Sequence, residues 1–242
     1  MELDGQVALV TGSGVRVGKA LALALAREGV RLAVHYHSSA GPANETVAQI
    51  KVLGSDALAI QADLSLPGQV LPVIEHVAAH FGRMDILINS AAIFERGDLA
   101  HTTEDSWDRH FAINLKAPFF LSQAFAGQLG KDRPGHIVNI TDWRGVRPDT
   151  DYLAYSLTKA ALLTLTKGLA LALAPNVQVN AIALGAILPP PGRDRAYLET
   201  LAQAIPLRRV GSPAEVAKAL TFFLKSDFVT GEVIFVTGGE HL

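Results

Sequence analysis

The stretch Val7-Ala-Leu-Val-Thr-Gly-Ser-Gly-Val-Arg-Val-Gly18 decides the fold, because a short apolar run leads directly into a glycine-rich turn. The run predicts a buried strand, and the Ala- and Leu-rich residues 17–27 predict a helix that stops near Gly29. Glycines between a strand and a helix let the backbone approach a pyrophosphate, which the helix N-terminus binds through its free N–H groups. The stretch therefore favours a dinucleotide-binding α/β unit over a tight turn without a ligand.

The rest of the chain repeats this alternation of short apolar runs and longer helical patterns. Strands are expected at 6–11, 30–35, 57–60, 85–88, 135–140, 177–182 and 232–236. Helices are expected at 17–27, 41–53, 68–81, 103–129 with an interruption at Pro118, 152–174 and 213–224. Strict alternation predicts a single-domain, Rossmann-like, doubly wound parallel sheet of about seven strands, with helices on both faces.

One domain is expected to span residues 1–242, with a substrate loop at about 185–212. The least regular segment, which is rich in Pro and Gly, runs from Gly185 to Arg195. This segment could be a linker, but strand and helix resume after it. We therefore expect a substrate loop over an active site.

Composition narrows the classes of function. The chain is 49% hydrophobic and 18% charged, with a net charge of −2 and no cysteine. These values exclude disorder, disulfides and thiol nucleophiles, and they give no basic excess for nucleic acid or acidic membranes. No signal peptide or membrane span is expected, since Glu2 and Asp4 replace a basic start and prolines break the longest uncharged stretch. We expect a soluble, cytoplasmic protein that does not bind nucleic acid or membranes.

No metal site is expected. His76 and His80 have a spacing that can bind zinc, but no third ligand is evident.

The helix expected at 152–174 is apolar around most of its circumference. Such a helix needs burial on nearly all sides. One side can cover the sheet, and the other is expected to meet a neighbouring subunit, although another element of the same chain could cover it instead. We therefore expect a homo-oligomer, with a tetramer as the expected size.

Four features follow one another along the chain in a fixed order. They are the turn Thr11–Gly18, the sequence Asn89-Ser-Ala-Ala92 after the fourth strand, Asn114, and the pair Tyr155 and Lys159. Together they resemble the short-chain dehydrogenase/reductases, and the resemblance runs from the first strand to the last. It implies a nicotinamide cofactor, a catalytic Tyr155, a Lys159 that holds the ribose, and an Asn114 that anchors a water chain behind Lys159.

The Tyr155–Lys159 pair also has a physical interpretation. Residues four apart share a helix face. A charged Lys159 near the cofactor would lower the pKa of Tyr155 and make it a better acid near neutrality.

Departures from the usual family pattern point to one branch. Arg16 replaces a glycine of the phosphate loop, and Asp142 replaces the catalytic serine thirteen residues before Tyr155. The second strand ends in His35-Tyr-His-Ser-Ser39, and the aromatic Phe94 follows the Asn89 motif. This combination resembles the pteridine reductase branch, which includes the bacterial dihydromonapterin reductases. It implies an NADPH-dependent reductase that gives hydride to a C=N carbon of a dihydropterin or dihydrofolate.

The expected substrate residues are Arg16, Phe94, Asp142 and Tyr155. Phe94 offers a flat face for a heteroaromatic ring. Asp142 follows a strand end, where parallel sheets place their ligands. We expect it to form, with Tyr155, an acid unit that begins the cycle carrying a proton, although it could instead be an N-cap or bridge a loop. Asp149 and Asp151 lie nearby but lack the thirteen-residue spacing.

Charge indicates the cofactor. No acid occurs at the end of the second strand before Glu45, so a 2′-phosphate would meet no repulsion there and would find His37, Ser38 and Ser39. NADPH is therefore expected over NADH, and the resemblance places Asp63 near the adenine. The residues expected to bind the cofactor are Gly12, Ser13, Arg16, Val17, His35, Tyr36, His37, Ser38, Ser39, Asp63, Leu64, Asn89, Ser90, Ala91, Tyr155, Lys159, Gly185 and Ile187.

Two alternatives remain open. A carbonyl reductase of the same fold, such as a 3-oxoacyl thioester reductase, is disfavoured by Asp142 and Arg16. A non-catalytic NADP-binding regulator is disfavoured by the intact Tyr155–Lys159 pair, because a sensor needs no proton donor.

Overall fold

The computed structural model describes residues 1–130, 133–190 and 192–242, so Pro191 of the expected substrate loop lies outside the described residues. Seven parallel strands form one sheet in the order β3-β2-β1-β4-β5-β6-β7. The strands are β1 (Val7–Val10), β2 (Arg31–Tyr36), β3 (Ala57–Gln61), β4 (Ile86–Asn89), β5 (Gly135–Asp142), β6 (Val177–Leu184) and β7 (Val233–Val236). The predicted doubly wound parallel sheet is confirmed.

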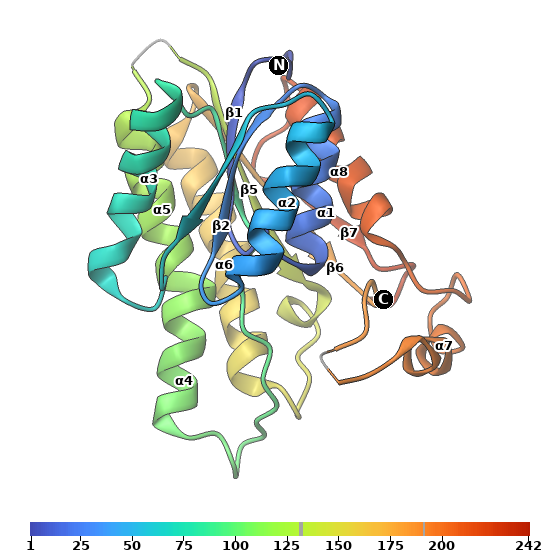
Figure 1. Cartoon of the computed structure of the whole chain (residues 1–242). Coiled ribbons are helices and arrows are strands. Elements are labelled where there is room, and N and C mark those ends of the chain that lie inside the picture. Colours follow the sequence, from blue (N-terminus) through green and yellow to red (C-terminus); the bar gives the residue numbers. More distant parts are fainter. Residues whose placement is uncertain (131–132, 191) are drawn as a thin grey trace.

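Helices cover both faces of the sheet (Figure 1). Helices α1 (Arg16–Arg27), α2 (Ala40–Val52) and α8 (Pro213–Lys225) contribute to one hydrophobic core. Helices α3 (Pro67–Phe81), α5 (Ala117–Gln128) and α6 (Leu153–Leu173) contribute to the other. Because helices cover the sheet on both faces, the strands are apolar throughout.

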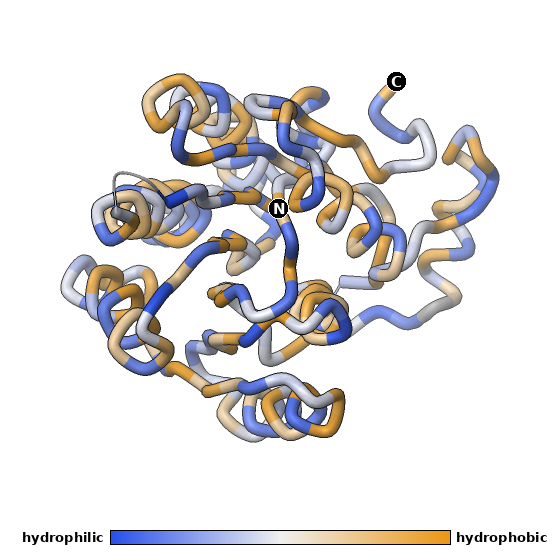
Figure 2. The backbone as a smooth tube through the Cα atoms, turned by 90° about the horizontal axis from the view of Figure 1, so that it is seen from above, coloured by the Kyte–Doolittle hydropathy of each residue, from blue (hydrophilic) through white to orange (hydrophobic). Residues whose placement is uncertain are grey.

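Strand β1 shows how one short run serves two cores. Ala8 and Val10 belong to the core beneath α1, whereas Val7 and Leu9 belong to the core beneath α3, and all four are fully buried. Successive side chains of a strand point to opposite faces, so an unbroken apolar run is what a strand covered on both sides requires. Seen from above, hydrophobic and hydrophilic residues alternate along the surrounding helical coils (Figure 2).

Two helical regions differ from the sequence prediction. The helix expected at 103–129 is divided into α4 (Glu104–Phe111) and α5 by a π-helical segment, η1 (Ala112–Lys116), which ends just before the predicted break at Pro118. The expected substrate loop at about 185–212 contains the helix α7 (Arg195–Ala202), which was not among the helices expected from the sequence. Helix α7 is short and is capped by Asp194, whose side chain accepts the N–H of Tyr197.

Helix α6 is the one described helix long and apolar enough, by length and composition, to cross a membrane. It packs on β5 and β6 within the fold. Its buried residues include Tyr155 and Lys159. Part of its apolar surface is packed within the fold, whereas Leu157 and Leu171 are exposed.

Candidate active site

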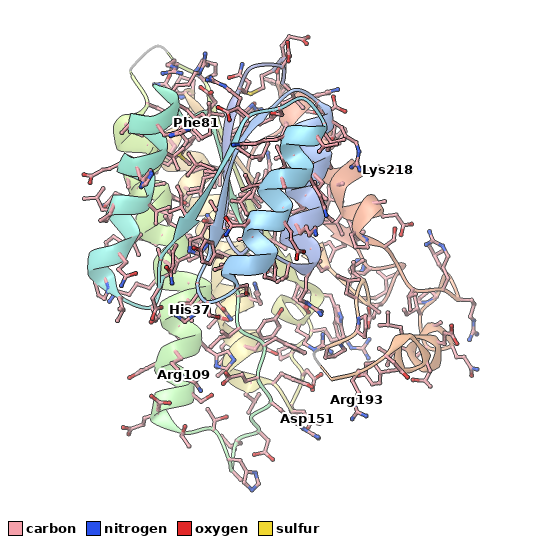
Figure 3. All side chains as sticks on the ribbon, viewed as in Figure 1. His37, Phe81, Arg109, Asp151, Arg193 and Lys218 are labelled. Carbon is pink, nitrogen blue, oxygen red and sulfur yellow. The ribbon has the colours of Figure 1, made fainter. Side chains whose placement is uncertain are left out.

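The carboxyl ends of the strands gather the expected functional residues at one end of the molecule. His37, Asp151 and Arg193, from the segments that follow β2, β5 and β6, lie toward that end, whereas Phe81 lies at the opposite one (Figure 3). The chain order of the sheet reverses between β1 and β4, which is where such sheets bind ligands. Thr11 joins the two loops there, because its Oγ1 accepts the N–H groups of Ser90 and Ala91, each at 2.9 Å.

The turn after β1 is tightly packed at two glycines. Gly12 has φ +65°, and a Cβ there would lie 2.9 Å from the Cα of Ala91. A Cβ on Gly18 would lie 2.5 Å from the carbonyl oxygen of Gly12. Ser13 is buried, and its hydroxyl donates to the Val10 carbonyl at 2.7 Å. Side chains are therefore excluded where the backbone must approach a phosphate.

Arg16 connects this turn to the segment after β6. Its backbone has φ +56°, a left-handed conformation that costs a non-glycine residue about 1–2 kcal/mol. Its Nη2 donates to the Pro189 carbonyl at 2.7 Å. The structure therefore pairs Arg16 with the expected substrate loop, a contact that the sequence does not reveal.

His35 supports the turn. Its Nδ1 accepts the N–H of Gly12 at 3.1 Å, and its Nε2 lies 3.1 Å from the carbonyl of Ala62. Burial lowers the pKa of His35 to about 4, which keeps the ring neutral. Both ring nitrogens of His35 are thus bonded to backbone, so the ring supports the turn. That His35 also contacts the cofactor stays a prediction.

His37 and Ser38 are exposed beyond β2, in the region expected to hold a 2′-phosphate. The Nε2 of His37 lies 3.6 Å from a carboxylate oxygen of Asp63. Hydrogen bonds from Ser65 lower the pKa of Asp63. A carboxylate therefore stands beside the expected phosphate residues, although none occurs on β2 itself.

Asn89 faces the protein interior. Its side-chain amide donates to Asn139 at 2.9 Å, and Asn139 donates to Thr166 at 2.9 Å. The side chain of Asn89 thus belongs to a buried polar chain. That Asn89 binds the cofactor stays a prediction.

Tyr155 and Asp142 form the centre of the site. The hydroxyl of Tyr155 donates to Oδ2 of Asp142 at 3.1 Å, and both side chains are buried. Burial and the Asp142 carboxylate raise the pKa of Tyr155 well above its usual value. The prediction that the pKa of Tyr155 is lowered is therefore wrong for this structure.

Lys159 is fully buried beside Tyr155. Its Nζ donates to the Ile140 carbonyl at 3.0 Å and lies 5.5 Å from the centre of the Tyr155 ring. Burial lowers the pKa of Lys159 to about 8, although the Asp142 carboxylate opposes this shift. Lys159 is thus mostly charged at neutrality and loses its charge as the pH rises through about 8.

Sequence reasoning missed Arg144. Its backbone N–H and its Nη1 lie 2.9 and 3.4 Å from Oδ1 of Asp142, and its Nε lies 3.1 Å from Oδ2 of Asp149. Asp142 is therefore an N-cap as well as the partner of Tyr155. The sequence signal was slight: a cation two residues after Asp142.

The expected substrate aromatic Phe94 is already stacked on Tyr152, with ring centres 4.3 Å apart and 6° between the planes. Its ring also meets Tyr155 edge-on at 4.7 Å. One face of Phe94 is therefore covered by Tyr152, so a ligand ring must use the other face or displace Tyr152.

Asn114 lies in the π-helical segment, a feature frequent at functional sites. Its Oδ1 accepts the N–H of Ile93 at 2.9 Å, and its Nδ2 donates to the carbonyl of Ile93 at 3.0 Å. Its Nδ2 also donates to Thr158, next to Lys159, at 3.2 Å. Asn114 thus fixes the loop that carries Phe94.

Glu240, in the C-terminal segment, interacts electrostatically with Arg144 and Asp142. Its Oε2 accepts the N–H of Ala186 at 3.0 Å, and a Cβ on Gly185 would lie 2.6 Å from that oxygen. Burial raises the pKa of Glu240. Ile187, two residues beyond Gly185, is buried.

Comparison with known proteins agrees with this arrangement. A family model described as Enoyl-(Acyl carrier protein) reductase matches residues 14–241. The chain belongs to the short-chain dehydrogenase/reductase family. Within this family, the 3-oxoacyl-[acyl-carrier-protein] reductase FabG of Staphylococcus epidermidis is 34% identical over 240 residues, which cover 97% of this chain and 98% of that protein. Versicolorin reductase of Emericella nidulans is also 34% identical, over 98% of this chain and 96% of its own.

Solved structures of short-chain reductases are similar throughout. FolM alternative dihydrofolate reductase 1 from Brucella canis, complexed with NADP, has a TM-score of 0.95 and 32% identity, over 99% of this chain and 95% of that one. The corresponding Brucella suis protein, also with NADP, has a TM-score of 0.94 and 33% identity, over 100% and 96% of the two chains.

Proposed function

We propose that this short-chain reductase uses NADPH to reduce the C=N bond of a pterin, converting a dihydropterin or dihydrofolate to its tetrahydro form. The observation that carries the proposal is the Asp142 carboxylate, 3.1 Å from the hydroxyl of Tyr155, at a position where the family usually has a serine. The names of the similar Brucella proteins, alternative dihydrofolate reductases, support the same substrate class.

The residues present fit a dinucleotide. The turn at Gly12 and Gly18 has no room for side chains, and it leads into the N-terminus of α1. No carboxylate lies on β2, and His37 and Ser38 are exposed at its end. When bound, NADPH supplies the hydride. We infer that Lys159, buried beside Tyr155, would hold the nicotinamide ribose.

The chemistry at Asp142 favours a C=N substrate. Reduction of a carbonyl develops negative charge on oxygen, and a nearby carboxylate opposes that charge instead of donating a hydrogen bond to it. Reduction of either bond adds hydride to carbon and takes a proton from the hydroxyl of Tyr155, which is held at this point. A dihydropterin also carries ring N–H and amino groups that can donate to the Asp142 carboxylate, whereas a ketone carries no such donor.

A second candidate function is reduction of a 3-oxoacyl thioester, which the similarity to FabG favours. A steady-state screen of dihydropterins and 3-oxoacyl thioesters, each with NADPH and NADH, separates the two candidates. We expect the higher kcat/KM for a dihydropterin with NADPH. A higher kcat/KM for the thioester would overturn the pterin proposal. Absence of turnover with both classes would favour a non-catalytic NADP-binding regulator.

We also propose that the enzyme is a cytoplasmic homo-oligomer, with a tetramer as the expected size. An apolar groove of about 840 Å³ lies between α4, α5 and α6, and Phe119 and Phe120 in its lining are exposed. Its lining includes Phe111, Leu115, Phe119, Phe120, Ala161 and Leu165. A second copy of the chain would bury this surface through the same helices.

A further inference from the structure

Arg144 is held between two carboxylates and three aromatic rings at the edge of the site. Its guanidinium contacts Asp142 and Asp149, and only 20% of its side chain is exposed. Its Cζ lies 4.7 Å from the ring centre of Trp143 and 5.5 Å from those of Phe94 and Tyr152. A planar guanidinium can pair with carboxylates through its edge and with rings through its face, which an ammonium cannot do.

The contacts of Asp142 define its role. It accepts hydrogen bonds from the backbone N–H of Arg144, from the Arg144 guanidinium and from the hydroxyl of Tyr155. The other charged groups that act on this region are Lys159 on α6, Asp149, and Glu240 from the C-terminal segment. Lys159 donates to the Ile140 carbonyl, so among the described residues Arg144 is the cation in contact with Asp142.

We propose that Arg144 is a positioning residue: by holding Asp142 as a hydrogen-bond acceptor, it selects a nitrogen heterocycle with N–H donors over a ketone. This inference rests on the proposed pterin reduction, and it identifies the residue that makes the site prefer a pterin. A pterin presents ring N–H and amino groups that pair with an acceptor. A ketone presents only an acceptor oxygen, and two acceptors facing each other leave both groups without a donor.

The first test compares substrates. Arg144→Met keeps the packing volume against the rings and removes the charge. Arg144→Lys keeps the charge but lacks the planar, forked guanidinium. Arg147→Met is the matched control, because Arg147 is an exposed arginine three residues away. We expect Arg144→Met to lower the ratio of kcat/KM for dihydropterin to that for 3-oxoacyl thioester by roughly ten- to a hundredfold, as for a lost hydrogen bond to a charged group. Arg144→Lys should recover part of the ratio, and Arg147→Met should leave it unchanged.

The second test needs no turnover. The ¹³C NMR signal of the Asp142 carboxyl, assigned with Asp142→Asn, reports the surroundings of that group. We expect the signal to move in Arg144→Met, because the guanidinium that contacts Oδ1 of Asp142 is gone. If no pterin is reduced by the wild type, the proposed function fails, while this signal still decides whether Arg144 controls Asp142.

Two results would overturn the role of Arg144. One is an unchanged substrate ratio together with an unchanged carboxyl signal in Arg144→Met. The other is an equal loss of NADPH affinity and of activity on both substrates in both Arg144 variants, which would show that Arg144 only supports the loop.

Discussion

Tyr155 donates its phenolic hydroxyl to the carboxylate of Asp142 over 3.1 Å, although the two side chains come from helix α6 and the end of strand β5. Asp142 is a hydrogen-bond acceptor at a position where the family usually has a serine, whose hydroxyl is a donor. Because the Tyr155 hydroxyl donates to this carboxylate, a substitution at Asp142 also changes the surroundings of the Tyr155 proton.

Asp142→Asn tests the pair directly. The carboxamide keeps the shape but cannot take up or release a proton. We expect kcat on dihydropterin to fall roughly 10²–10⁴-fold, the usual contribution of one acid–base group, with NADPH affinity unchanged. Asp142→Ser restores the usual family residue and should favour a carbonyl substrate. If Asp142→Asn keeps the wild-type kcat, Asp142 acts only as an N-cap and takes no part in the chemistry.

The pKa of Lys159, lowered by burial to about 8, predicts the alkaline side of the pH profile. The charged ammonium is present below that pH and is lost above it. Since only the charged form can stabilise a tyrosinate at Tyr155, kcat should fall as pH rises through about 8. A profile that stays flat well above this pH would contradict the role of Lys159, and Tm measured over the same range controls for unfolding.

Cofactor preference is predicted to be moderate. His37 lies beside the carboxylate of Asp63, which competes with a 2′-phosphate for it. We expect kcat/KM to be higher with NADPH than with NADH, and His37→Ala to reduce this ratio roughly tenfold through loss of a charge-assisted hydrogen bond. Asp63→Asn should increase the ratio. Equal kcat/KM for the two cofactors in the wild type would refute the preference.

Phe94 is predicted to stack on the substrate through the face that Tyr152 leaves open. Phe94→Ala should raise the KM for dihydropterin by about 1–3 kcal/mol in free-energy terms, the range for stacking a base on an aromatic ring. The KM for NADPH should stay constant. Leu99→Ala, at an exposed position on the same loop, serves as the control. An unchanged pterin KM would leave Phe94 with a packing role alone.

The groove between α4, α5 and α6 predicts the effect of a charge on assembly. Phe119 is 41% exposed and lines this groove, whereas Val52 on α2 is 86% exposed and lies away from it. Phe119→Glu should lower the mass measured by sedimentation to that of a smaller assembly, because an unpaired charge would be buried. Val52→Glu should leave the mass unchanged. A monomeric wild type would exclude the oligomer.

The sequence by itself determined the features that depend on neighbours along the chain. The apolar run 7–10 followed by Gly12 and Gly18 defined the first strand, the turn and the helix. The spacing of Tyr155 and Lys159 placed both on one helix face. The alternation of strands and helices indicated a parallel sheet covered by helices on both faces. The strands agreed with this, because they were apolar on both sides. These features are periodic or local, so they are visible without coordinates.

Only the tertiary structure decided the electrostatics and the long-range contacts of the site. Arg144 lies between Asp142 and Asp149 because the turn after β5 folds back, and Arg16 reaches Pro189 across 173 residues of chain. Burial determined that the pKa of Tyr155 rises and that the pKa of Lys159 falls. Such shifts depend on the surrounding solvent and charges, which come from segments far apart in the sequence.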